Sequence, residues 1–196
     1  MAKLTRDFYK KSAILLSKDL LGKIFVRIID GKKISCRISE VEAYMGILDK
    51  AAHSYSGKRT NRTEVMYGEP GFLYVFIIYG MYNCANIVAA DVDIPEAVLI
   101  RAGVPLEGLD EMALRRYNKT YSLLSKKEKL NLANGPGKLC KAMGIDRTDN
   151  GEDLCENITY LEDDGSRPEI SVSKRIGIDY AEEAADFLWR FYIKEE

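Results

Sequence analysis

The sequence Gly71–Ile87 reads GFLYVFIIYGMYNCANI and holds two apolar runs on either side of a glycine. This pattern is typical of two β-strands joined by a tight turn. Strands of this apolarity are ordinarily buried, whereas turn tips usually carry small polar residues because they face water. Here the tip reads YGMY, so that Tyr79, Met81 and Tyr82 stand at or beside the turn. The hairpin therefore raises the question of what its aromatic tip contacts.

The rest of the chain alternates helical and strand patterns around this hairpin. Upstream, the sequence predicts a helix over 7–22 with Asp7 as N-cap and Gly22 as its end, a hairpin over 23–44 turned at Asp30-Gly31, and a long ordered loop over 45–71. Downstream, it predicts a strand over 96–106, a charged helical segment over 106–132, a helix from Pro136 to Gly144, strands over 157–163 and 169–178, a short helix over 179–188 and a final strand over 189–193. No internal repeat or linker is visible, so we expect one α+β domain over 1–196.

Composition and charge narrow the class of protein. With 196 residues, 46% hydrophobic and 30% charged, the chain has the composition of an ordinary globular domain. No run approaches the roughly 20 apolar residues of a membrane helix, and the first residues lack the apolar core of a signal peptide, so we expect a cytoplasmic protein without membrane contact. The net charge of −1 gives no global sign of nucleic-acid binding. Basic residues nevertheless gather at Lys58, Arg59 and Arg62, and again at Lys138 and Lys141.

Cysteine and histidine usage argues against a metal site. The four cysteines form no Cys-x-x-Cys pair, and His53 is the single histidine. Zinc sites are built from closely spaced cysteines and histidines, so we predict no metal, no cofactor, and reduced cysteines in packed positions. A single histidine also excludes any catalytic arrangement that needs two imidazoles.

Glu42 is the first candidate for catalysis. In the strand-like run ISEVEAY, Glu40, Glu42 and Tyr44 fall on one face because side chains alternate along a strand. A carboxylate at a strand end, just before a long loop, is well placed to activate a water, although spacing alone favours a solvent-facing glutamate. Arg101 stands in the apolar run VLIRAGV, and buried arginines are rare unless paired. A buried pair with an acidic residue would be structural or would orient a water at a reaction centre.

His53 and Asn86 are weaker candidates, because a lone histidine is more often structural than catalytic and Asn86 would serve equally to hold a neighbouring turn. Together, however, the signals match a family. The blocks EVEAY, AAHS, GFLYVFIIYGMYNCANI, VLIRAGVP, NGPGKLCKAMGI, RIGI and WRFY occur in the order and approximate spacing of the alkyladenine (3-methyladenine) DNA glycosylases, which the chain resembles from Leu15 to Ile193. The resemblance implies a single mixed domain with a curved antiparallel sheet, surrounding helices and a protruding β-hairpin.

The resemblance also implies roles for individual residues. Glu42 resembles the general base that deprotonates the water attacking C1′ of the damaged nucleotide, and Arg101 and the main-chain carbonyl of Ile176 resemble the groups that hold this water. In the implied base pocket, Tyr44 and His53 form one wall, Phe76 forms the opposing wall, and Asn86 crowds the exocyclic amino group of guanine. Tyr79 resembles the residue inserted into the duplex where the damaged base has been removed. Beyond the resemblance, we expect Met81 and Tyr82 to pack against the flanking groove, and Lys138 and Arg175 to contact phosphates.

The implied function is excision of damaged purines. Enzymes of this kind flip alkylated or deaminated purines, the class of 3-methyladenine, 7-methylguanine, hypoxanthine and ethenoadenine, out of duplex DNA and hydrolyse the N-glycosidic bond, which leaves an abasic site. Alkylation at N3 or N7 makes the purine cationic, so that aromatic faces bind it and it leaves readily. No lysine nucleophile is evident among the pocket residues, so we expect a monofunctional enzyme. We also expect a monomer, associated with the nucleoid if the source is bacterial.

Phe76 departs from the family, in which tyrosine is common at this position. Stacking survives that change, but a hydroxyl hydrogen bond is lost, which bears on substrate preference.

Two alternative functions stand beside the glycosylase. A non-catalytic nucleic-acid-binding module would explain the basic clusters and the aromatic tip but does not need Glu42. A small-molecule hydrolase would use Glu42 and Arg101 but does not need an aromatic hairpin tip.

Overall fold

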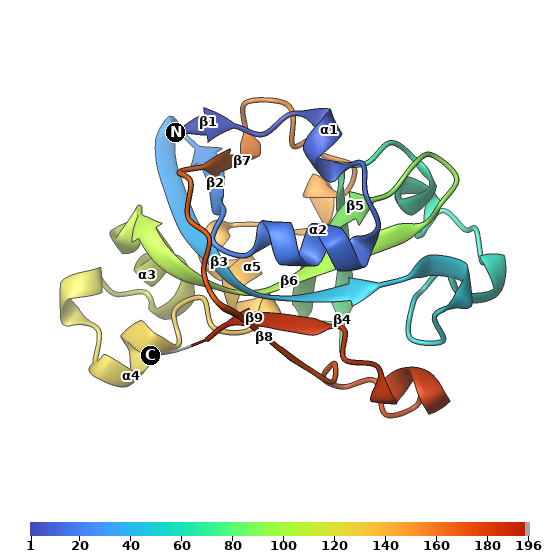
Figure 1. Cartoon of the computed structure of the whole chain (residues 1–196). Coiled ribbons are helices and arrows are strands. Elements are labelled where there is room, and N and C mark those ends of the chain that lie inside the picture. Colours follow the sequence, from blue (N-terminus) through green and yellow to red (C-terminus); the bar gives the residue numbers. More distant parts are fainter. Residues whose placement is uncertain (195–196) are drawn as a thin grey trace.

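A curved antiparallel sheet forms the framework of the protein (Figure 1). The computed structural model describes residues 1–194. Within that range nine strands pair in the order β1-β7-β2-β3-β6-β5-β4, and β9 pairs with β3 and β8. The strands are β1 (Ala2–Lys3), β2 (Ile24–Ile29), β3 (Lys32–Tyr44), β4 (Leu73–Ile78), β5 (Tyr82–Ala89), β6 (Glu96–Glu107), β7 (Thr159–Asp163), β8 (Ile170–Ser173) and β9 (Arg190–Ile193).

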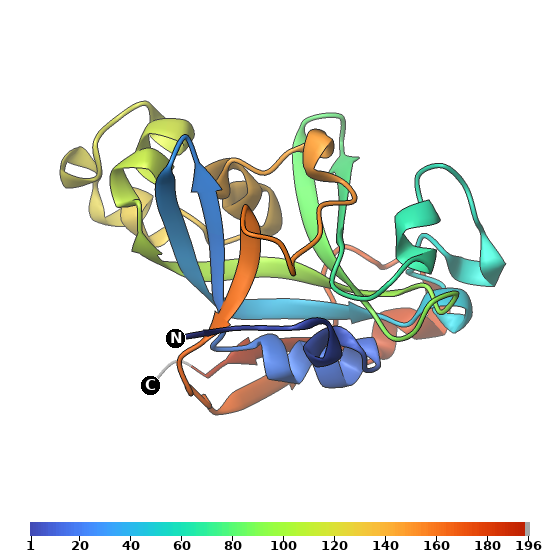
Figure 2. The same ribbon diagram turned by 90° about the horizontal axis from the view of Figure 1, so that it is seen from above.

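Helices lie on both sides of this sheet. They are α1 (Arg6–Tyr9), α2 (Ala13–Leu20), α3 (Leu109–Tyr117), α4 (Lys126–Leu130) and α5 (Pro136–Met143). Figure 2 shows α2 on one side of β3 and β6 and α3 and α5 on the other, with the β4–β5 hairpin rising from the sheet on the side of α5. The predicted α+β class, with a curved sheet and a protruding hairpin, is confirmed. None of the helices in this part of the chain is long and apolar enough to cross a membrane.

Short 3₁₀ turns lie between the helices and strands of residues 1–194. They are η1 (Gly46–Leu48), η2 (Tyr55–Gly57), η3 (Glu64–Tyr67), η4 (Tyr121–Leu123), η5 (Arg147–Asp149) and η6 (Glu182–Asp186). The first three lie in the predicted long loop over 45–71, which is therefore ordered without longer helices. η6 takes the place of the short helix predicted over 179–188.

The predicted helix over 7–22 is wrong as a single element. α1 ends at Tyr9, and Lys10 leaves the helical region with a ψ of 67°. α2 begins at Ala13, whose N–H donates to the carboxylate of Glu96 on β6 (2.7 Å). A carboxylate from a distant strand thus satisfies the start of the second helix, and local periodicity contains no sign of that contact.

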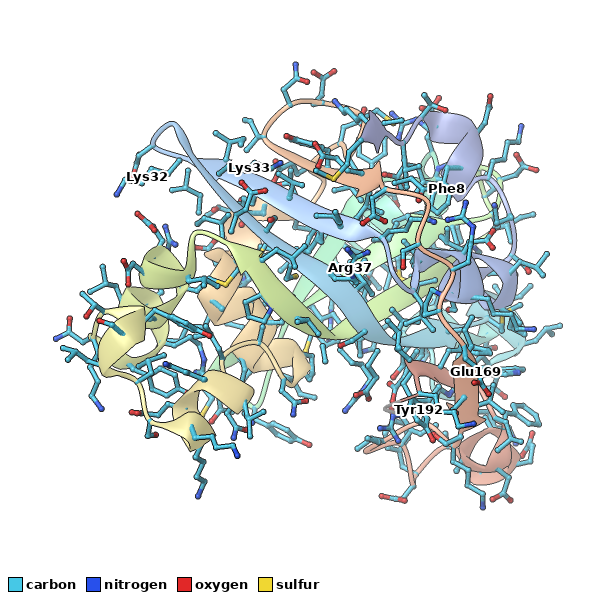
Figure 3. All side chains as sticks on the ribbon, turned by 60° about the vertical axis from the view of Figure 1, so that its left-hand side comes forward. Phe8, Lys32, Lys33, Arg37, Glu169 and Tyr192 are labelled. Atoms are coloured by element: carbon cyan, nitrogen blue, oxygen red, sulfur yellow. The ribbon has the colours of Figure 1, made fainter. Side chains whose placement is uncertain are left out.

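The turn between β2 and β3 has the predicted form. Asp30 and Gly31 both have positive φ (51° and 73°), as a two-residue turn between antiparallel strands requires. Lys32 and Lys33 follow this turn and mark the end of β3 that is remote from Tyr44 (Figure 3). The long strand therefore carries Tyr44 to the opposite end of the sheet.

The segment over 106–132 is less helical than predicted. β6 continues to Glu107, and the chain beyond it folds as α3, a 3₁₀ turn and α4. Asn118 ends α3 in the left-handed region, with a φ of 55°. By contrast, α5 begins at Pro136 and is ended by Gly144 in the left-handed region, as predicted.

Alternation along the strands separates a core face from a second face. Val41, Ile100, Ala85 and Val75 are buried in the main hydrophobic core. Their neighbours in sequence point to the other face of the sheet. That second face, at the ends of β3, β4, β5 and β6, carries most of the residues predicted for function.

Candidate active site

A single row of side chains crosses five strands of the sheet. In the strand register, Arg190 of β9 lies opposite Glu42 of β3, and Glu42 lies opposite Leu99 of β6. Leu99 lies opposite Asn86 of β5, and Asn86 opposite Tyr74 of β4. Residues paired in this way point to the same face of a sheet. Side chains that are far apart in the sequence are thus aligned around Glu42.

Glu42 is fully buried, and three groups contact its carboxylate. Tyr44 Oη donates a hydrogen bond to Oε2 (2.9 Å), the Ile176 main-chain N–H donates to Oε1 (2.8 Å), and Arg101 Nη1 lies 3.3 Å from Oε1. Burial raises the pKa of Glu42 above its usual value, although Arg101 and the two hydrogen bonds act in the opposite direction. The interpretation of Glu42 as a solvent-facing strand residue is therefore wrong. It is a desolvated carboxylate, more basic than an exposed glutamate.

Arg101 is paired, as its apolar surroundings led us to expect. Besides its contact with Glu42, it donates through Nε to Glu40 Oε1 (2.8 Å). Arg190 Nε donates to the same oxygen (2.7 Å). The strand pattern predicts that Glu40 shares a face with Glu42 but predicts no role for it. Arg190 was not predicted, because the pairing of the final strand with β3 has no local sequence signal.

A cavity of about 470 Å³ lies against the groups that contact Glu42, since Tyr44, Arg101 and Ile176 all line it. Its volume is in the range of pockets that bind small organic ligands, roughly 300–1,000 Å³. Other predicted residues along its walls are His53, Phe76, Tyr79, Tyr82, Asn86 and Lys138. Lining residues that sequence analysis did not identify include Met66, Tyr74, Ile178 and Tyr180.

His53 is held by Tyr74 and Arg62. Its Nδ1 lies 2.8 Å from Tyr74 Oη, and Arg62 Nη2 lies 3.1 Å from its Nε2 and 3.4 Å from its Nδ1. Because arginine only donates, a ring nitrogen that bonds Arg62 is an acceptor. Burial and then the charge of Arg62 lower the pKa of His53 to about 4. The imidazole is therefore uncharged near neutral pH.

His53 and Phe76 belong to the same wall of the cavity, contrary to the prediction that they face each other. Their ring centroids are 4.6 Å apart and their planes meet at 80°, an edge-to-face contact that leaves no room for a base between them. Tyr74 packs beside Phe76 (5.4 Å between centroids), and the Arg62 guanidinium lies 5.1 Å from the centre of the Phe76 ring. Tyr74 precedes Phe76 by two positions on β4. Because side chains two positions apart on a strand point to the same face, this spacing could have predicted that Tyr74 lies in the same wall as Phe76.

Asn86 is buried and fixed by the main chain. Its Nδ2 donates to the carbonyl oxygens of Tyr74 (3.0 Å) and Cys84 (3.4 Å). Both partners lie on β4 and β5, so Asn86 does not hold a neighbouring turn, which was the alternative interpretation from the sequence. Asn86 therefore presents a rigid polar group to the cavity, and its predicted effect on guanine stays a prediction.

The hairpin tip is exposed. Tyr79 has a φ of 54° and is 80% exposed, while Met81 and Tyr82 are 67% and 50% exposed. A tyrosine in the left-handed region is strained, and such residues persist where function or packing requires them. Because so little of the Tyr79 side chain is buried, packing into the core does not explain its position.

The start of α5 approaches both the hairpin and the cavity. A Cβ added to Gly137 would lie 3.0 Å from the Cβ of Tyr82, so that a larger residue would require Tyr82 to shift. Lys138 lines the cavity, and its Nζ donates to Asn131 Oδ1 (2.6 Å). Its hydrogen-bond partner is an amide rather than a carboxylate, so this contact leaves the positive charge of Lys138 unneutralised.

The predicted phosphate contact by Arg175 is wrong. Its side chain is fully buried and forms a two-pronged ion pair with Asp49 (2.5 and 2.9 Å), which is also fully buried. Arg175 further donates to the main-chain oxygens of Ala43 (2.9 Å) and Ala184 (3.1 Å), and its guanidinium lies 4.8 Å from the centre of the Tyr44 ring. It therefore ties η1, the end of β3 and η6 together behind Tyr44, where no phosphate reaches it.

Ile176 contacts Glu42 through a different group from the one predicted. The prediction concerned its main-chain carbonyl, whereas the N–H donates to Glu42. The residue is about half exposed and lines the cavity, and the role of its carbonyl toward a water stays a prediction.

The cavity offers no arrangement for a bound metal among the described residues. Within residues 1–194, no group of three or more His, Cys, Asp and Glu side chains is placed to hold an ion. Burial raises the pKa of Cys84, which lines the cavity, to about 11, so that this thiol stays protonated. Glu42, whose pKa burial raises, is a buried carboxylate in contact with three of the lining residues.

Comparison with known proteins agrees with this geometry. The sequence model of the methylpurine-DNA glycosylase (MPG) family matches residues 7–196. A relative named "Putative 3-methyladenine DNA glycosylase" from Desulfitobacterium hafniense (strain Y51) is 53% identical over 196 residues, which cover 100% of this chain and 97% of the relative. Relatives of the same name from Clostridium novyi (strain NT) and Alkaliphilus oremlandii (strain OhILAs) are 55% and 54% identical, covering 100% and 98% of this chain and 96% of each relative. The chain belongs to the methylpurine-DNA glycosylase family.

Proposed function

We propose that this enzyme flips N-alkylated purines, 3-methyladenine and 7-methylguanine among them, out of duplex DNA and hydrolyses their N-glycosidic bond with a water activated by Glu42. The observation that carries the proposal is the buried Glu42 carboxylate, contacted by three residues that all line one base-sized cavity. The relatives that carry the name 3-methyladenine DNA glycosylase support the same substrate class.

In the proposed reaction, Glu42 takes a proton from water as the water oxygen bonds to C1′ of the flipped nucleotide. The C1′–N bond breaks with its electron pair going to the purine, which neutralises the positive charge of the alkylated base. Raised basicity suits Glu42 to this task, because a general base works best when its pKa approaches the working pH. Arg101, at 3.3 Å, is placed to orient the carboxylate and the water beside it.

Selection of a cationic base would come from aromatic faces rather than from many hydrogen bonds. Tyr44 supplies one wall, and Phe76 with His53 supplies another. Electron-rich rings favour a cation, and a cationic purine leaves without prior protonation. Because His53 is neutral near pH 7, it is a poor proton donor, and a neutral base such as hypoxanthine should leave more slowly.

Three further features support recognition of a flipped nucleotide in duplex DNA. Asn86, fixed on the strands, would crowd the exocyclic amino group of an undamaged guanine. Tyr79, exposed on the hairpin, would fill the gap that the flipped base leaves in the stack. Lys138, beside the cavity, would contact a phosphate.

The reaction as proposed needs no covalent intermediate, metal or second subunit. We propose a monomer that leaves an abasic site with an intact backbone. Its substrate places it at the DNA, which in a bacterium is the nucleoid of the cytoplasm.

The test is incubation with duplex oligonucleotides that each carry one lesion, followed by alkaline cleavage of abasic sites. We expect cleavage at 7-methylguanine, slower cleavage at hypoxanthine, none at undamaged guanine, and the same rates with a chelator present. An intact lesion strand after prolonged incubation would favour a non-catalytic DNA-binding protein. Equal activity on free nucleosides would favour a small-molecule hydrolase.

A further inference from the structure

Arg101 occupies an irregular position in the sheet. Where β3 pairs with β6, Ile38 lies opposite Gly103, Glu40 opposite Ala102 and Val41 opposite Ile100, which leaves Ser39 and Arg101 without partners in the ladder. Bulges of this kind re-aim a side chain and are common beside active sites. Here the irregularity places the Arg101 guanidinium between two carboxylates of the same strand.

The two carboxylates do not share Arg101 equally. Its Nε donates to Glu40 at 2.8 Å, whereas its Nη1 lies 3.3 Å from Glu42. The shorter, hydrogen-bonded contact is therefore made to Glu40, which is not a pocket-lining residue. Glu40 in turn accepts from Arg190 at 2.7 Å, and Arg190 is held by Ser173 Oγ (3.2 Å).

We propose that Glu40 and Arg190 are positioning residues of the glycosylase reaction, which hold Arg101 away from a close ion pair with Glu42 so that Glu42 remains a base. The inference rests on the proposed function, because it concerns the proton that Glu42 takes from water. A tight Arg101–Glu42 pair in a desolvated site would stabilise the carboxylate and make it a weaker base. Glu40 prevents this by accepting the better hydrogen bond, and Arg190 balances the charge of Glu40.

Burial is the largest influence on the pKa of Glu42, and the charge of Arg101 is the largest influence that opposes it. Several charged and titratable groups lie around Glu42. They are Glu40 and Tyr44 on β3, Cys84 on β5, Arg101 on β6, Arg175 after β8 and Arg190 on β9. Burial raises the pKa of Tyr44 well above its usual value and that of Cys84 to about 11, so both are neutral at working pH. The charge of Arg175 is balanced by Asp49. Glu40, Arg101 and Arg190 remain. Glu40 and Arg190, the two residues to be tested, carry opposite charges.

The test is the pH dependence of single-turnover excision of 7-methylguanine from duplex DNA, a cationic base whose departure needs no proton donor. In the unmodified protein, the rate should fall on the acid side as Glu42 becomes protonated. Glu40→Gln removes a negative charge and frees Arg101 to pair with Glu42, so the acid limb should move to lower pH by on the order of one unit. The plateau rate should also fall, because the carboxylate is then a weaker base.

Arg190→Gln should move the same limb in the opposite direction. It removes a positive charge opposite Glu42 and leaves Glu40 to hold Arg101 alone, so Glu42 should protonate at higher pH. Arg190→Lys keeps the charge and should restore most of the original profile. If Glu40→Gln does not fold, as judged by its circular dichroism and melting curve, the Arg190→Gln and Arg190→Lys pair decides the question.

A second ion pair on β3 provides matched controls. Arg37 precedes Glu40 on β3, toward the Lys32 end of the strand (Figure 3). It pairs with Asp164 (2.7 Å), and neither residue lines the cavity. Asp164→Asn and Arg37→Gln make the same changes in net charge and should leave the acid limb in place. Limbs that stay unchanged, or that move in the same direction, in Glu40→Gln and Arg190→Gln would overturn the inference while leaving the proposed function intact. Absence of excision by the unmodified protein would instead overturn the proposed function.

Discussion

Tyr44 Oη donates a 2.9 Å hydrogen bond to Glu42 Oε2, two positions earlier on β3. A residue that lines the cavity therefore also contacts the proposed general base. In the proposed reaction, this side chain would link recognition of the purine with activation of the water. The Arg175 guanidinium lies 4.8 Å from the centre of the Tyr44 ring and 4.9 Å from the centre of the Trp189 ring.

Tyr44→Phe separates these two roles. The ring that stacks on a base is kept, whereas the hydrogen bond to the carboxylate is lost. That bond lowers the pKa of Glu42, so its loss should raise the pKa further and move the acid limb of excision to higher pH. Binding to a lesion duplex, measured by fluorescence anisotropy, should change little. A variant with weakened binding and an unmoved limb would show that the hydroxyl serves the pocket alone.

Glu42→Gln should abolish excision without harming the fold. General base catalysis typically contributes about 10²–10⁴-fold, and glutamine keeps the shape of the side chain while removing its basicity. The pKa of Glu42 is raised in the folded state. The free energy of unfolding should therefore fall as pH rises through that folded pKa and the buried carboxyl group becomes charged, whereas a neutral glutamine is not affected. We therefore expect the melting temperature of Glu42→Gln to equal or exceed that of the unmodified protein at pH 8, with a smaller difference at pH 4. Near-normal single-turnover excision would remove Glu42 from the mechanism.

Tyr79→Ser tests the hairpin tip. With 80% of this side chain exposed, the substitution should change the melting temperature little. Stacking of an aromatic ring on a base is worth about 1–3 kcal/mol, so excision from duplex DNA should fall roughly tenfold or more. The defect should shrink when the lesion lies opposite a gap, where flipping costs less. Equal defects in both contexts would argue against a wedge.

Lys138→Ala should reduce the salt dependence of DNA binding. Each phosphate contact that is lost lowers the slope of log affinity against log salt by about 0.9. Lys32→Ala, at the β2–β3 turn remote from the cavity, is the matched control and should leave the slope unchanged (Figure 3). Lesion preference should be the same in both variants. Identical slopes for Lys138→Ala and the unmodified protein would mean that Lys138 contacts no phosphate.

Arg175→Met should weaken the fold rather than the salt dependence. Removing one partner of a buried ion pair typically costs about 3–5 kcal/mol, because the other charge is left buried and unpaired. Urea unfolding should show this loss, and Asp49→Leu combined with Arg175→Met should recover much of it. The slope of affinity against salt should stay unchanged for both variants, since Arg175 is fully buried. A reduced slope would reinstate the phosphate contact.

Much of the architecture could be predicted because it depends on local pattern. The apolar runs on either side of Gly80, the Asp30-Gly31 turn and the Pro136 helix start each determine their own conformation within a few residues. The helix over 7–22 could not be placed correctly, because Glu96, far along the chain, caps its second half. Local periodicity carries no information about such a contact.

For the site, the sequence by itself determined which residue types are present and, through the resemblance to known glycosylases, which of them to examine. Only the tertiary structure decided how they act on one another. Strand register brings Arg190 opposite Glu42, a bulge directs Arg101 toward Glu40, and burial turns Arg175 from an expected phosphate contact into a brace behind Tyr44. Charge, basicity and availability depend on burial and on neighbours across the sheet, and those neighbours are set by the pairing of strands that are distant in the sequence.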